Sequence, residues 1–244
     1  MTFSQSPPSY TTRAPPTVCC SVLSALVLLH FISTLPAQST VPTKQTHLNM
    51  DKTATDITLT CHPELSSNVI RIRYSVSNTG KSDIYLLDIF PGYDAETRKP
   101  FADFHSYYLC LRDGATAYLL KGIPPLPANK TVMVRIMPLG TKLEPGQQID
   151  RTFEVSLPLC EQSPWYYPKL PPEAYKPIEI HRLVFAVQFL RSSIEGFVAT
   201  PAPHDSGLFR VAGKYTVGQT ETLLSELKIP PMKFLTRTDR FSRL

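Results

Sequence analysis

Charged residues are scarce in this chain. They make up 18% of its 244 residues, whereas soluble proteins usually contain about 25%. Arg13 is the only charged residue before residue 38, so residues 38–244 carry 24 Lys and Arg against 20 Asp and Glu, and 24 − 20 gives +4. This small, scattered surplus excludes the basic footprint of a nucleic-acid-binding surface. The tail after Lys228 is locally basic, and a solvated terminus explains it more simply than a polyanion site.

Motifs of catalysis, metal binding and nucleotide binding are also lacking. The chain contains no GxSxG, HExxH, CxxC, P-loop or GxGxxG pattern, so we expect no enzymatic activity, no cofactor and no metal. Two acid and histidine neighbours, Asp103 with His105 and Glu179 with His181, are more simply polar residues at a strand end and on an exposed strand face. The acidic loop around residues 91–104 matches no calcium loop and is more simply a solvated hairpin.

The longest uncharged apolar run is VCCSVLSALVLLHFISTL, residues 18–35. Arg13 precedes it and small residues follow it, an order typical of a signal peptide that is cleaved near Ala37 or Ser39. Its length also reaches the lower limit for a membrane-spanning helix, about 17 to 25 residues. Both interpretations predict an extracytoplasmic body, either secreted or periplasmic, or anchored with the body outside. A hydrophobic core helix is the remaining alternative. An uncleaved run is the only membrane contact that we expect.

Short segments rich in Val, Ile, Thr, Tyr and Phe follow from about residue 56, and turn residues separate nearly all of them. In VIRIRYSVSN, Ile72 and Tyr74 alternate with Arg71 and Arg73, which predicts one buried and one solvated face. We expect eight strands, over residues 57–61, 69–78, 83–90, 107–113, 115–122, 131–138, 150–159 and 178–190.

Strands at this spacing, with no long helical pattern between them, predict an all-β antiparallel sandwich. Only QTETLLSELK, residues 219–228, has helical periodicity, with Thr220 as N-cap and three leucines on one side. We therefore expect a β-sandwich of about eight strands with one short C-terminal helix. The domain boundaries are expected as follows: signal peptide or anchor 1–40, linker 41–55, sandwich 56–218, and helix with basic tail 219–244.

Two strand and turn patterns, YSVSNTGKSDIYLLD and KLEPGQQIDRTFEVSLPL, resemble those of immunoglobulin-like and fibronectin-like modules of exported proteins. The resemblance covers roughly residues 56–195. It implies an architecture, and no function transfers with it because this fold serves many functions.

Three cysteines follow the N-terminal run, and an oxidising compartment permits one disulfide among them. We prefer Cys61 with Cys160, because both lie at strand ends that are followed by polar residues, whereas Cys110 lies within a strand. Three buried, reduced thiols are an equally good interpretation.

The segment SPWYYPKLPPEAYKP, residues 163–177, combines five prolines with the aromatic residues Trp165, Tyr166, Tyr167 and Tyr175. Prolines exclude a central strand or a regular helix and favour a stiff, extended conformation. A stiff aromatic loop presents contact area at a small ordering cost. Folding back to cover one end of the core is the alternative role.

Two classes of function follow. The first is an exported, non-enzymatic binding or structural module, which contacts a protein partner or envelope component through residues 163–177 or a sheet edge. The second is an exported hydrolase acting on peptide or glycan, whose active site cannot be located from one sequence. The lack of a nucleophile motif favours the first.

Overall fold

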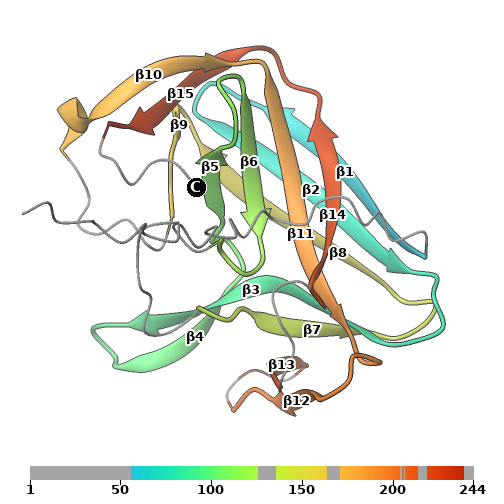
Figure 1. Ribbon diagram of the computed structural model, residues 1–244. Coiled ribbons are helices and arrows are strands. Elements are labelled where there is room, and N and C mark those ends of the chain that lie inside the picture. The colour runs from blue at the N-terminus through green and yellow to red at the C-terminus, as the bar shows by residue number, and fades with distance from the viewer. Residues whose placement is uncertain are drawn as a thin grey trace, which may run out of the picture. The chain divides into compact units, whose positions relative to one another are not determined.

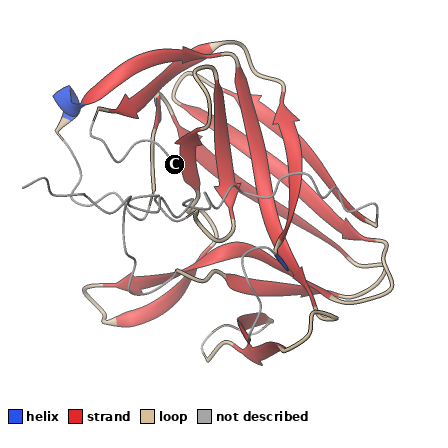
Figure 2. Ribbon diagram, viewed as in Figure 1, coloured by secondary structure: helices blue, strands red, loops and turns tan. Residues whose placement is uncertain are grey.

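The computed structural model describes residues 56–125, 136–163, 171–203, 205, 207–213 and 219–238. All of them belong to one compact unit, Lys44–Leu244. This part of the chain is built of β-strands, with one short 3₁₀ turn, η1 (Pro172–Ala174), and no α-helix among these residues (Figure 2). The predicted all-β class is therefore confirmed.

The strands are more numerous than the eight predicted, because the described residues form fifteen. They are β1 (Ile57–Leu65), β2 (Val69–Asn78), β3 (Ile84–Asp94), β4 (Lys99–Asp103), β5 (Tyr108–Leu111), β6 (Thr116–Lys121), β7 (Leu139–Leu143), β8 (Gln148–Ser156), β9 (Leu159–Cys160), β10 (Tyr175–Ile180), β11 (Arg182–Arg191), β12 (Phe197–Pro201), β13 (Leu208–Gly213), β14 (Glu221–Leu227) and β15 (Met232–Arg237). Most of the predicted strand at 131–138 lies outside the described residues.

The strands form three sheets (Figure 1). One has the order β1-β2-β8, a second has the order β10-β15-β9, and the largest has the order β12-β13-β7-β3-β11-β6-β5, with β14 paired to β11 and β4 paired to β3. The pairs β6 with β11 and β9 with β15 are parallel, and the other pairs are antiparallel. The purely antiparallel prediction is wrong at these two pairs. Long connections lead from the first strand of each pair to the second, so no hairpin imposes an antiparallel direction.

The main core lies between the β1-β2-β8 sheet and the larger sheet, an arrangement consistent with a sandwich. Ile70, Ile72 and Val76 of β2 are fully buried, and Tyr74 is 3% exposed. They pack with residues of β3, β6, β11 and β14. The predicted alternation in β2 is confirmed.

This alternation predicts opposite responses to substitution at neighbouring positions. Ile72→Val should lower the free energy of unfolding by about 1 kcal/mol, because it removes a buried methylene. Arg73→Ala should change it by less than about 0.5 kcal/mol, because the Arg73 side chain and its ion-pair partner Glu64 are both exposed. Urea denaturation of the two variants measures the difference, and equal losses would contradict the assigned register.

The C-terminal helix predicted at residues 219–228 is wrong, because residues 221–227 form strand β14. β14 pairs antiparallel with β11 along its whole length. The Arg191 guanidinium binds the Glu221 carboxylate at 2.6 Å and fixes the start of the strand. Leu223 and Leu227 enter the core, whereas Leu224, predicted to lie beside them, is on the other face and 40% exposed. Tertiary pairing with β11 has overridden the local helix propensity.

The predicted single strand at residues 178–190 is two strands in two different sheets. β10 ends at Ile180 and pairs with β15, while β11 begins at Arg182 and pairs with β6, β3 and β14. The backbone N–H of His181, between them, donates to the carbonyl oxygen of Ala115. The apolar pattern is continuous across this break, so it does not reveal the change of sheet.

Three prolines lie on edge strands at positions where the missing N–H costs no sheet hydrogen bond. In β1, β10 and β12 the even-numbered residues face the neighbouring strand, as shown by Thr79 N–H to Asp56 O, Thr238 N–H to Ala174 O and Ala202 N–H to Leu208 O. The odd-numbered Pro63, Pro177 and Pro201 therefore face outward. Proline at such a position prevents a further strand from pairing there. This placement explains three of the 24 prolines of the chain.

The described residues include no helix long and apolar enough to cross a membrane. The predicted signal or anchor at residues 18–35 lies outside these residues.

Candidate functional site

The predicted contact segment, residues 163–177, is described only at its two ends, so Trp165, Tyr166 and Tyr167 lie outside the described residues. Its first end follows β9, and its second end is η1 and the start of β10. β9 and β10 flank β15 in the same sheet. The two ends are therefore held on either side of one strand, about 10 Å apart at ordinary strand spacing.

Tyr175 is the one predicted contact residue that the structure describes. It is the first residue of β10, is half-buried, and lies opposite Arg237 of β15. A side-chain hydrogen bond joins Tyr175 to the Cys160 thiol of β9. Tyr175 thus links β9 and β10, the strands on either side of the segment, and anchors the second end of the segment.

Glu161 fixes the other end of the segment. Its side chain is buried, and its Oε2 accepts hydrogen bonds from Thr236 Oγ1 at 2.8 Å and from the Arg237 backbone N–H at 2.9 Å. Both donors belong to β15. A buried carboxyl group that accepts one hydroxyl and one backbone hydrogen bond from the same strand holds the chain firmly.

The three cysteines of the described residues are free thiols. Cys61 lies in β1, Cys110 in β5 and Cys160 in β9. Burial raises the pKa of Cys61 to about 11 and that of Cys110 to about 12, and it also raises the pKa of Cys160. Such thiols are protonated at neutral pH and are poor nucleophiles. The pairing of Cys61 with Cys160 stays a prediction.

A buried ionic cluster, consisting of Tyr74, Asp88, Lys121 and Arg151, lies in the core. We call it the Asp88 cluster. Lys121 is completely buried, and Asp88 is 1% exposed. The Tyr74 hydroxyl donates to Asp88 Oδ2 at 2.7 Å, and Arg151 Nε lies 3.7 Å from the same oxygen. The cluster joins four strands: β2, β3, β6 and β8.

The Lys121 ammonium group uses its three N–H donors within the protein. Nζ donates to the backbone oxygens of Asp88, Phe104 and Ser106, at 3.2, 2.8 and 3.0 Å. It also lies 4.6 Å from the centre of the Phe153 ring, a cation–π contact. These bonds fasten the loop after β4 to the core.

Burial controls the ionisation of this cluster. Desolvation lowers the pKa of Lys121 to about 8, although the charge of Asp88 opposes the shift. Desolvation raises the pKa of Asp88, although the Tyr74 hydrogen bond and the nearby cations oppose it. Strongly shifted groups often mark catalytic sites. Here the lysine has no remaining donor for a substrate, so its geometry is that of a structural cation.

The sequence contains a weak signal for this cluster that the sequence analysis missed. Asp88 interrupts the apolar run of β3, and Lys121 ends the apolar run of β6. A charge inside a buried strand needs a partner. The pattern does not reveal which partner, because 33 residues separate the two.

The two acid and histidine pairs considered from the sequence show no catalytic geometry. Asp103 Oδ1 accepts the backbone N–H groups of His105 and Ser106, which forms a local turn. His181 Nε2 lies 3.6 Å from Glu179 Oε1, and both side chains are well exposed. Within the described ranges, no group of three or more His, Cys, Asp or Glu side chains is placed to hold a metal ion.

Comparison with known proteins leaves the fold and these clusters as the basis for assigning a function. No family model matches the chain, and no curated protein or solved structure shows significant similarity to it.

Proposed function

We propose that this chain is an exported, non-enzymatic binding or structural module that contacts a protein partner or an envelope component through residues 163–177. The observation that carries the proposal is the anchoring of both ends of this segment on β15. Glu161 holds one end and Tyr175 holds the other.

Anchoring and composition together favour binding. The segment contains five prolines, which restrict its backbone before any partner arrives. Trp and Tyr, its main large side chains, are the types that most often dominate the energy of protein interfaces. A segment of this kind contacts a partner at a small entropic cost.

The same proposal assigns the domain to the immunoglobulin-like or fibronectin-like sandwiches. The support is the β1-β2-β8 sheet, which packs on a larger sheet around a shared apolar core. The two parallel strand pairs are additions to that plan.

Fluorescence tests the location of the contact surface, because Trp165 is the only tryptophan. We expect red-shifted emission that a small polar quencher readily reduces, since a contact residue is solvated before its partner binds. Partner addition should shift the emission to the blue. Emission that is already blue-shifted and protected in the isolated protein would place Trp165 in the core and contradict the proposal.

Export is tested in the apolar run at residues 18–35. Replacing Leu26 and Leu28 by Arg should block translocation, because each charge costs about 2.5 to 3.5 kcal/mol at the centre of such a segment. Fractionation of cells that express the tagged protein measures this. Leu26→Val with Leu28→Val is the control and should leave export intact. Export of the double-Arg variant would refute the targeting role.

A further inference from the structure

The sheet edge formed by β8 contains no proline, unlike the edges formed by β1, β10 and β12. In β8 the odd-numbered residues face β2, as the bond from Leu157 N–H to the Asn68 carbonyl shows. The even-numbered residues therefore point their backbone N–H and C=O groups outward. These residues are Gln148, Asp150, Thr152 and Glu154, and all four are exposed. Pro63, Pro177 and Pro201 occupy the equivalent outward positions of β1, β10 and β12.

The outward backbone groups of these four β8 residues have no hydrogen-bond partner within the described ranges of the chain. Near the end of β8 the edge is covered by Tyr107, which hydrogen-bonds to the backbone of Ser156. Among the strands that the structure describes, the order β1-β2-β8 likewise places none beyond β8. An edge with several consecutive outward groups is a template for an added strand.

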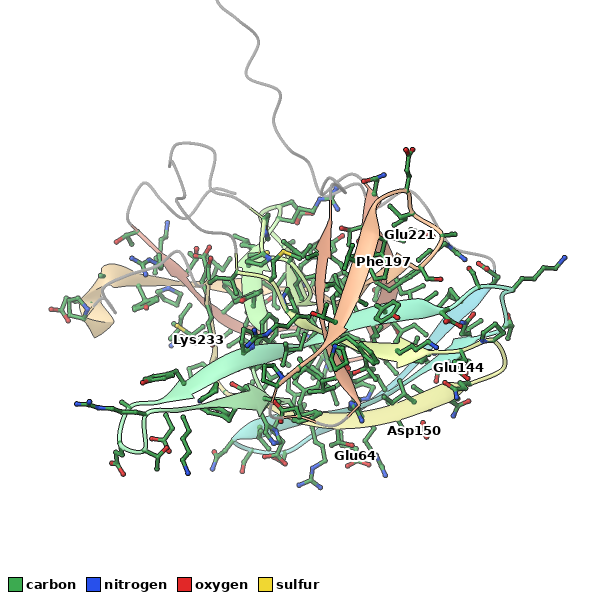
Figure 3. The ribbon with its side chains drawn as sticks, turned by 90° about the horizontal axis from the view of Figure 1, so that it is seen from below. Glu64, Glu144, Asp150, Phe197, Glu221 and Lys233 are labelled. Atoms are coloured by element: carbon green, nitrogen blue, oxygen red, sulfur yellow. The ribbon has the colours of Figure 1, made fainter. Side chains whose placement is uncertain are left out.

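The charges along this edge select the partner. Asp150 and Glu154 lie on the outer face of the sheet, and Figure 3 shows Asp150 pointing away from the interior, as Glu64 of β1 does. No basic residue lies on this face of β8. A second copy of β8 would bring two more carboxylates and no cation, so the edge disfavours self-pairing. Glu154 Oε1 already accepts hydrogen bonds from the Arg71 guanidinium of β2, at 2.8 and 2.9 Å. The preference for a basic partner strand therefore rests mainly on Asp150.

The inner face of β8 defines the alternate positions of the partner. Ile149 is partly buried and Phe153 is fully buried there, while Arg151 is occupied with Asp88 and the Phe104 ring. A strand added beside them would turn its alternate side chains toward an apolar surface, so these side chains should be apolar.

We infer that the β8 edge binds an extended peptide segment of another protein, with a basic side chain opposite Asp150 on one face and apolar side chains on the other. This inference rests on the proposed role of the chain as a binding module. It identifies a second contact surface and the chemical nature of its partner.

The probe is the synthetic peptide TVKVTVKVT, compared with the acidic peptide TVEVTVEVT. We expect the basic peptide to bind the full chain at least tenfold more tightly, measured by titration calorimetry at low salt. Replacing both Asp150 and Glu154 by Lys should reverse the preference. Equal affinity for the two peptides, or binding by neither, would overturn the inference.

Thr152→Pro tests the backbone contribution, because it removes an outward N–H and leaves the ladder with β2 complete. Thr152→Pro should weaken binding of the basic peptide at least tenfold, whereas Thr152→Ala, which keeps the N–H, should not. Peptide binding unchanged in Thr152→Pro would overturn strand addition.

Amide hydrogen exchange can be measured on the unmodified protein, so this test does not depend on whether a variant folds. Peptide addition should slow exchange at Asp150, Thr152 and Glu154, while Arg151 and Phe153 are already protected by β2. Slowing at the odd-numbered positions alone would contradict the edge. If Trp165→Ala abolishes partner binding and Thr152→Pro does not, the aromatic segment binds that partner independently of the β8 edge. Failure of the peptide to bind would then count against the β8 edge alone.

Discussion

Lys121→Met is expected to lower the free energy of unfolding by about 3 to 5 kcal/mol. Removing one partner of a buried charge pair leaves the other without compensation. Here Asp88 would lose the charge of the fully buried Lys121, and the carbonyl oxygens of Phe104 and Ser106 would lose their hydrogen-bond donor. Urea denaturation measures the loss.

Two controls separate the cluster from a general effect of removing a lysine. Lys99→Met, at an exposed position of β4, should cost less than about 0.5 kcal/mol. The double variant Asp88→Asn with Lys121→Met should recover much of the lost stability, because it removes the orphaned charge. Additive losses in the double variant would show that the two side chains do not act as a pair.

The stability of the wild type relative to Lys121→Met should depend on pH in a defined way. The pKa of Lys121 is about 8 in the folded protein and 10.5 for an ordinary lysine. Between these values the unfolded chain binds a proton that the folded protein has released. The contribution of Lys121 to the free energy of unfolding is therefore complete above pH 10.5 and is lost as the pH falls through 8. The stability difference between wild type and Lys121→Met should widen by roughly 3 kcal/mol from pH 8 to 10.5.

Trp165→Ala is expected to weaken partner binding by about 2 kcal/mol or more and to leave the melting temperature nearly unchanged. Large aromatic side chains at the centre of an interface commonly carry this much of the binding energy. If residues 163–177 instead completed the core, the substitution would open a cavity and cost about 3 to 5 kcal/mol of stability. Calorimetry of binding and of unfolding, on the same preparation, distinguishes the two.

The control is Tyr175→Phe, which keeps the ring and removes the hydroxyl that bonds Cys160. It should reduce stability slightly, by about 1 kcal/mol, and affect binding less than Trp165→Ala does. A large fall in melting temperature for Trp165→Ala, with binding unchanged in the folded fraction, would sink the contact proposal and make the segment part of the core.

The sequence by itself determined the features that repeat locally along the chain. The period of two in VIRIRYSVSN is a property of one strand, so it identified the bounds of β2 and its buried face. The spacing of β-type segments indicated an all-β protein for the same reason. The composition of residues 163–177 also marked the candidate contact segment, whose two ends alone lie in the described part of the chain.

Only the tertiary structure decided which segments meet. QTETLLSELK has a helical pattern, yet its strand form gains a full ladder with β11 and a place for Leu223 in the core. Three further features depend on partners far away in the sequence: the break between β10 and β11 at His181, the contact of Lys121 with Asp88, and the outward direction of Pro177. Local periodicity carries no information about such pairing, because the free energy that selects a strand's partner comes from packing and hydrogen bonds between distant segments.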